Sequence, residues 1–332
     1  MNLHYRHSGR IPPAGLILMP VAGGLTAIAL GVIYSFAICY IPIVYLNLLL
    51  TIGFGMGIGF ALAWAARVTQ VRSATYGLLA MAVSVAVGYY AAWGADFLAR
   101  IGTDDAPIWV AWHPDLLANY IPEFYEKGAW SLKGNTTVSG VFLGAVWAIE
   151  LGAIIYFAWL GVSSFFKENT FCEDCYGWSQ RRNALAVYGT NNALEVSRKL
   201  NTGDVNALSS CAPAVKGASD FLSLNAHICP SCDEHCYVTL QRVTTTVNGK
   251  GESKTETKTM VDRLGVDGAS LKTILAAAPA PVAADPQIGP PAGQPPIGPP
   301  PAAQASSQPK VGPPPATGGS GGSPIGPPPG FR

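Results

Sequence analysis

The chain has 332 residues, of which 49% are hydrophobic and only 12% are charged, and its formal net charge is +1. Soluble domains ordinarily carry about 25% charged residues, so this composition excludes a single soluble enzyme domain of ordinary kind. Long apolar runs fill residues 15–162, after a short N-terminal segment at residues 1–14. Ordinary soluble sequence follows over residues 163–275, and 18 of the 27 prolines lie in residues 276–332.

Four segments of the first half are long and apolar enough to cross a bilayer core of about 30 Å, which needs about 20 helical residues. They cover residues 15–38, 43–66, 74–99 and 138–162. The first segment exceeds the apolar core of a secretory signal and is expected to be retained as a helix. The sequence therefore predicts an α-helical membrane bundle of four transmembrane helices, with the lipid bilayer as its surroundings.

The basic residues that flank these segments predict their orientation. Basic residues precede the first segment, separate the second from the third, and follow the fourth, whereas the loop at residues 100–137 carries more acidic than basic residues. This distribution predicts an integral protein of the plasma or inner membrane with both termini cytoplasmic. Apolar residues at helical spacing after Pro114 predict one or two short helices in the extracytoplasmic loop, lying on the membrane surface, because the interior Pro122 can break a single helix.

Glycines alternate in the second segment, where Gly53 and Gly57 interleave with Gly55 and Gly59. Small residues four positions apart allow close approach of helix backbones in lipid. Two interpretations follow, either a homo-oligomer through the Gly53/Gly57 face or packing within the protein's own bundle.

Two acidic residues lie inside the apolar segments, Glu150 at the middle of the fourth and Asp96 near the outer end of the third. An ionised carboxylate at the bilayer centre costs a few kcal/mol even on lenient scales. Glu150 should therefore face the bundle or stay protonated. It is a candidate for proton or ion transport or, alternatively, for a structural hydrogen bond between helices.

Six of the seven cysteines follow the fourth segment, and four of them form two C-x-x-C pairs. The pairs are Cys172 with Cys175 and Cys229 with Cys232. Disulfides are disfavoured in a reducing cytoplasm, so clustered thiols point to metal or redox chemistry. Two such knuckles supply the four thiolates of a tetrahedral Zn²⁺ site, which would be structural because no coordination position stays open.

The paired knuckles resemble zinc ribbons in general, which implies a small α+β domain. The chain departs from that pattern because 53 residues separate the pairs, against about 15 to 20 in the common spacing. Cys236, His235 and Cys211 are alternate ligands. An iron–sulfur cluster, a dithiol redox pair and unligated thiols remain alternatives.

The sequence around the cysteines predicts two further elements and one exclusion. β-Branched residues on both sides of Asn248-Gly249 predict a hairpin next to the second knuckle, and residues 192–200 predict a short helix. Residues 163–275 carry twelve basic and twelve acidic residues. Binding to phosphates needs a basic surplus, so no nucleic-acid partner is expected.

The last 57 residues, 276–332, contain three charged residues and one aromatic residue. Such a segment buries too little apolar area to fold, so a disordered Pro/Gly-rich tail is expected. A motif of Ile or Val, Gly and two or three prolines recurs four times, starting at positions 288, 297, 311 and 325. The final Pro328-Pro329-Gly330-Phe331 resembles the Pro-Pro-Gly-hydrophobic ligand of GYF domains, which implies a polyproline-binding partner.

These patterns favour a non-enzymatic membrane-anchored adaptor or scaffold with a structural zinc site and a multivalent proline-rich tail. No phosphate-binding loop, metalloprotease motif or nucleophile elbow occurs in the sequence. The alternatives are a small proton- or ion-coupled transport subunit that uses Glu150 and a membrane-linked thiol redox protein that uses the C-x-x-C pairs.

Overall fold

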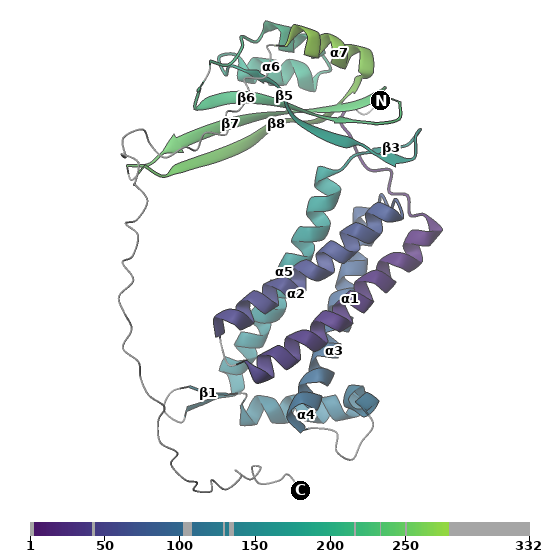
Figure 1. Ribbon diagram of the computed structural model, residues 1–332, viewed down its shortest axis with the longest axis vertical. Helices are drawn as coiled ribbons and strands as arrows, with labels where there is room; N and C mark the ends of the chain where they lie inside the picture. The colour runs from purple at the N-terminus through teal and green to yellow at the C-terminus, as the bar shows by residue number, and fades with distance from the viewer. Residues whose placement is uncertain are drawn as a thin grey trace, which may run out of the picture. The chain divides into compact units, whose positions relative to one another are not determined.

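The computed structural model describes residues 3–41, 44–101, 108–128, 130–132, 136–215, 217–232, 234–249 and 251–278 (Figure 1). The proline-rich repeats, including residues 328–331, lie outside the described residues. Four described helices are long and apolar enough to cross a membrane, which confirms the four predicted helical segments. They are α1 (Pro13–Tyr40), α2 (Val44–Val68), α3 (Ala74–Ile101) and α5 (Gly140–Glu168).

The four long helices form one bundle, in which α1 and α5 each pack against both α2 and α3. Its core is apolar and includes fully buried Met19, Ile58 and Ile154. At one end lie η1 (Ile108–Trp112), α4 (Pro114–Lys127), β1 (Trp130–Leu132) and β2 (Thr136–Val138). Of the one or two helices predicted in this loop, the structure has a single helix over the predicted residues, α4. It continues through Pro122 and ends before Gly128, whose φ of +93° suits glycine.

The alternating glycines of α2 face different surroundings. Gly55 and Gly59 are buried against α5, where a Cβ atom built on Gly55 would lie 2.5 Å from the backbone oxygen of Ile154. Gly57 lies against Leu30 of α1, whereas nothing lies within 4 Å of a Cβ atom built on Gly53. Three of these glycines therefore lie against other helices of the bundle, and only Gly53 of the four leaves an open surface.

This difference predicts opposite effects of two alanine substitutions in the same helix. Gly55→Ala should destabilise the chain by about 1–3 kcal/mol, because the added methyl group forces α2 away from the backbone of α5. Gly53→Ala is the matched control and should be neutral or stabilising by up to about 1 kcal/mol, through helix propensity alone. Thermal unfolding of both variants in one detergent measures the difference, and equal shifts would refute the packing role.

The region after α5 contains a four-stranded antiparallel sheet in the order β5-β6-β7-β8. The strands are β5 (Gln180–Tyr188), β6 (Asp220–Ile228), β7 (His235–Val247) and β8 (Ser253–Asp267). The predicted hairpin is confirmed as β7–β8, with residues 248–252 as its connection. The turn is longer than the Asn-Gly pair alone. The hydrogen bond that closes it runs from the N–H of Asn248 to the carbonyl oxygen of Glu252.

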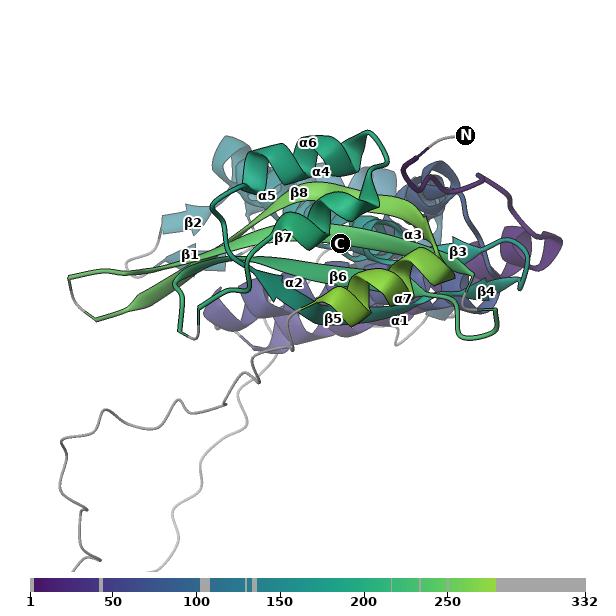
Figure 2. The same ribbon diagram turned by 90° about the horizontal axis from the view of Figure 1, so that it is seen from above.

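Helices cover one face of this sheet (Figure 2). They are α6 (Ala193–Asn201), η2 (Val205–Ser210) and α7 (Gly268–Ala277), and α6 is the helix predicted for residues 192–200. Leu200, Leu224 and Leu264 lie in the apolar core between the layers. The opposite face carries buried polar side chains, among them Asn225 and Thr239. The sheet module is therefore an α+β layer with its apolar core on one side.

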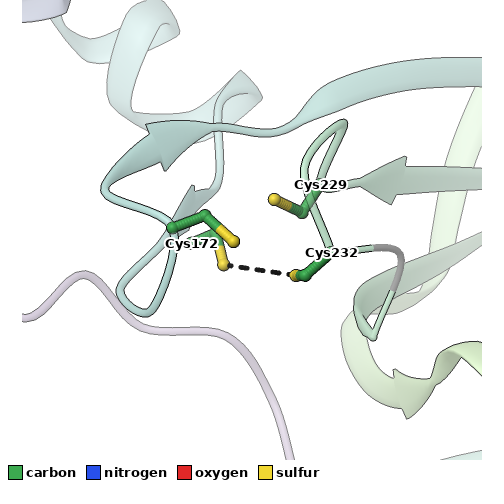
Figure 3. Close-up of side chains that lie close together, drawn as sticks. Cys172, Cys229 and Cys232 are labelled. Carbon is green, nitrogen blue, oxygen red and sulfur yellow. Dashed lines mark hydrogen bonds between the residues drawn. The ribbon is translucent and has the colours of Figure 1, made fainter.

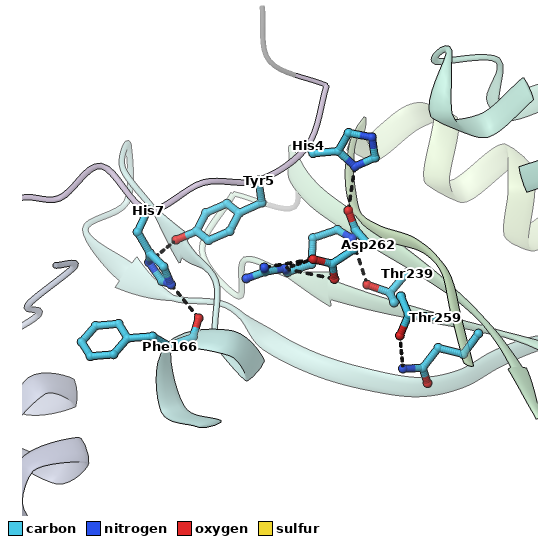
Figure 4. A network of polar contacts seen from close by, with 9 residues as sticks. His4, Tyr5, His7, Phe166, Thr239, Thr259 and Asp262 are labelled. Carbon is cyan, nitrogen blue, oxygen red and sulfur yellow. Dashed lines mark hydrogen bonds and ion pairs between the residues drawn. The ribbon is translucent and has the colours of Figure 1, made fainter. Parts of the chain in front are cut away.

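Residues 3–12 form an N-terminal arm that reaches the edge of the sheet, a contact that the sequence did not indicate. His4 pairs with Leu264 of β8, and the N–H of Gly265 donates to the carbonyl oxygen of Leu3 at 2.8 Å. The arm also contacts α5, where Nε2 of His7 lies 2.8 Å from the carbonyl oxygen of Phe166 (Figure 4). It therefore bonds to both the sheet and the bundle.

Candidate metal centre

The two C-x-x-C pairs lie in two tight turns far apart in the sequence. The first joins the short strands β3 (Phe171–Cys172) and β4 (Gly177–Trp178), directly after α5. Tyr176 adopts a φ of +51° there, which lets this turn close. The second turn connects β6 to β7, and the residues between the pairs form β4, β5, α6, η2 and β6. The long gap between the knuckles is thus occupied by the first two strands of the sheet and by α6 and η2.

The fold brings all four predicted cysteines together (Figure 3). Their sulfur atoms lie within 4.8 Å of one another, and those of Cys172 and Cys232 are 3.9 Å apart. A tetrahedral zinc ion with Zn–S distances of about 2.3 Å separates its sulfur ligands by about 3.8 Å. Cys172 and Cys229 are buried, whereas Cys175 and Cys232 are partly exposed. The cluster therefore has the size and donor set of a closed four-thiolate metal site.

Backbone N–H groups lie near the sulfur atoms of both turns. Those of His235 and Glu234 lower the pKa of the Cys232 thiol to about 6. Burial raises the pKa of Cys172, and the N–H groups of Cys175 and Asp174 oppose this shift. The adjacent Cys232 sulfur raises the pKa of Cys175. The site thus stabilises at least one thiolate, and ionisation of the whole set calls for a cation.

The alternate ligands lie outside the four-sulfur cluster. His235 is next to it, but its Nε2 pairs with the carboxylate of Asp174, so it joins the two turns through a side-chain contact. Cys236 is buried in the core of the sheet module, and Cys211 packs against that core. Among the described residues, only the two C-x-x-C pairs form a cluster of three or more such donors.

The first cysteine turn rests on the bundle through Arg72, which lies between α2 and α3. Its side chain is 5% exposed, and its guanidinium pairs with the carboxylate of Glu173 and stacks 4.4 Å from the ring centre of Phe171. Indole Nε1 of Trp178 donates to the carbonyl oxygen of Arg67 at 2.9 Å. These contacts attach the cysteine turn to the α2–α3 connection, and the sequence had indicated Arg72 only as a flanking charge.

The two acids of the long helices have partners on other helices. The Asp96 carboxylate accepts hydrogen bonds from the hydroxyl of Tyr120 at 2.7 Å and from Nε of Arg100 at 3.1 Å. Glu150 is half-buried, and its side chain lies near Tyr34 of α1. The Tyr120 contact is a hydrogen bond between helices, whereas Arg100 lies one turn from Asp96 in α3 itself.

Comparisons with known proteins give no family for the chain. No protein-family model, no curated protein and no solved structure matches it.

Proposed function

We propose that the chain is a membrane-anchored, non-enzymatic scaffold in which a structural zinc ion fixes the sheet module onto a four-helix membrane bundle. The observation that carries this proposal is the meeting of four cysteine sulfurs within 4.8 Å, contributed by two separate turns. One turn follows α5 and contacts the bundle, and the other belongs to the sheet. A metal ion coordinated by both turns would crosslink the sheet to the bundle.

The coordination chemistry supports a structural role over a catalytic one. A catalytic zinc site keeps an open position for water or substrate, whereas four thiolates fill a tetrahedral ion. The two buried cysteines limit access to solvent further. Four sulfur donors are typical of zinc and of iron–sulfur clusters, so the donor set favours zinc over ions that prefer oxygen or square-planar ligands.

The N-terminal arm and the sheet bond to each other, so they share one side of the proposed membrane. We place that side in the cytoplasm, since the flanking basic residues favour it. The proline motifs of residues 276–332 would then be presented there, and several copies would raise the local concentration for a polyproline-binding domain.

Elemental mass spectrometry of the full chain, purified in detergent, tests the zinc assignment. We expect about one zinc per chain, and four thiols that react with a thiol reagent only after a strong chelator is added. A metal-free chain with the four thiols already reactive would overturn the zinc site and favour the thiol redox alternative. Bound iron with visible absorbance would replace zinc by an iron–sulfur cluster.

A further inference from the structure

A cavity of about 430 Å³ opens beside the N-terminal arm, where α3, α5 and β8 meet. Three basic side chains line it, Arg6 of the arm, Lys167 of α5 and Arg263 of β8. Its described lining contains no aspartate or glutamate. Arg263 pairs with Asp262, which lies outside the lining, so the uncompensated positive charge of the lining comes from Arg6 and Lys167.

The backbone of Arg263 is shaped to bring this side chain to the cavity. Arg263 has a φ of +43°, which is uncommon for a residue other than glycine, and it lies at a bulge where the β7–β8 register shifts. Its N–H donates to Oγ1 of Thr239 at 3.2 Å, off the regular ladder. Bulges re-aim side chains, and strained residues of this kind concentrate at functional sites.

The Arg263 guanidinium contacts Tyr5 and Asp262, and these contacts do not use all of its N–H donors. It lies 5.5 Å from the ring centre of Tyr5, and its side chain is 17% exposed. The Asp262 carboxylate accepts from its Nε and Nη2 atoms. A guanidinium carries five N–H donors, so this pairing orients the group and still allows it to bind a second anion.

The other side of the same cavity is apolar. Leu78 of α3 and Trp159 and Val162 of α5 line it, and Nζ of Lys167 lies 5.7 Å from the centre of a Trp159 ring. These residues lie in helices apolar enough to cross a membrane, close to the ends that face the sheet. Charge on one wall and hydrocarbon on the other match a ligand with an anionic head and an acyl chain.

We propose that this cavity binds one anionic phospholipid, with its phosphate between Arg6, Lys167 and Arg263 and an acyl chain along Leu78, Trp159 and Val162. The proposal rests on the membrane location of the bundle given under the proposed function. It does not depend on the zinc site. A lipid without net charge gives no reason for three basic residues in the lining. Free phosphate gives no reason for the apolar wall.

Native mass spectrometry of the full chain in detergent tests the proposal with three probes. They are phosphatidylglycerol, phosphatidylcholine with the same acyl chains, and inorganic phosphate as a competitor. We expect one phosphatidylglycerol bound about tenfold more tightly than phosphatidylcholine, the order expected of a charge-assisted contact. Inorganic phosphate should not displace it. Equal binding of the two lipids, or displacement by phosphate at equal concentration, would overturn the proposal.

The double variant Arg6→Gln/Lys167→Gln keeps Arg263 and the bulge, so it tests charge without disturbing the sheet. It should lose about tenfold in phosphatidylglycerol affinity. The matched control is Arg67→Gln. Arg67 is an exposed base near the C-terminal end of α2, and it does not line the cavity. An equal loss of phosphatidylglycerol affinity in the two variants would show that general surface charge causes the loss, and it would refute the site.

Two measurements on the same preparations separate this inference from the proposed function. Zinc content reports the metal site, and retention of the chain in carbonate-washed membranes reports its membrane location. A chain that stays in the membrane without the lipid preference refutes the cavity assignment alone. A chain released by carbonate refutes the membrane location as well.

Discussion

Replacing Cys229 by serine should leave the purified chain almost free of zinc and loosen the sheet module from the bundle. Serine cannot supply the fourth thiolate, and structural zinc binding contributes about 10 kcal/mol or more in small zinc domains. The core of the sheet module should keep its strands folded, because it is separate from the cysteine turns. We therefore expect faster hydrogen exchange at residues 171–178 and 229–236, with slow exchange retained in the central part of β6.

Cys211→Ser is the matched control for this result, since Cys211 lies partly buried outside the four-sulfur cluster. It should keep the zinc content and the exchange pattern of the unmodified chain. Full zinc retention in the Cys229→Ser chain would contradict the four-thiolate site. Unfolding of the whole sheet would contradict the separation between metal site and core.

Replacing Arg72 by alanine should destabilise the chain by about 2–4 kcal/mol. The substitution removes a nearly buried guanidinium, its ion pair with Glu173, and its stacking on Phe171. The figure stays below that of a fully buried pair because the Glu173 side chain is 40% exposed and regains water. Thermal unfolding in detergent, followed by tryptophan fluorescence, measures the loss.

Two further variants test the origin of that loss. Arg67→Ala removes an exposed base from the end of α2 and should change stability by less than about 0.5 kcal/mol. Arg72→Lys keeps the charge but not the planar guanidinium, so it should recover only part of the stability. A neutral Arg72→Ala variant would show that the cysteine turn does not depend on this contact.

The long helices and the cysteine cluster were predictable because their signals are local. Twenty apolar residues in a row predict a helix that can cross a membrane whatever surrounds it. A C-x-x-C pair turns two sulfurs to one side, so two pairs suggest a common site even over a gap of 53 residues. The hairpin after Asn248 likewise followed from β-branched residues on both sides of a turn.

The contacts that depend on the tertiary arrangement were not predictable from the sequence. In the sequence, Arg72 does not differ from other basic residues that flank the apolar segments. Its contacts with Phe171 and Glu173 form only in the folded chain. Arg263 occupies an ordinary strand position in the sequence, and only the register shift between β7 and β8 reveals its left-handed backbone. Neither feature has a local pattern, because each requires two chain segments that meet only after folding.

The pairing of the N-terminal arm with β8 also constrains the order in which the protein is assembled. Nδ1 of His4 bonds to the carbonyl oxygen of Asp262, 258 residues later in the chain. At synthesis rates of about 5–20 residues per second, the arm waits about 10–50 s for its partner strand. All four long helices have left the ribosome by then. Closure of this sheet edge is therefore among the last events of biosynthesis, and the arm must stay accessible until it occurs.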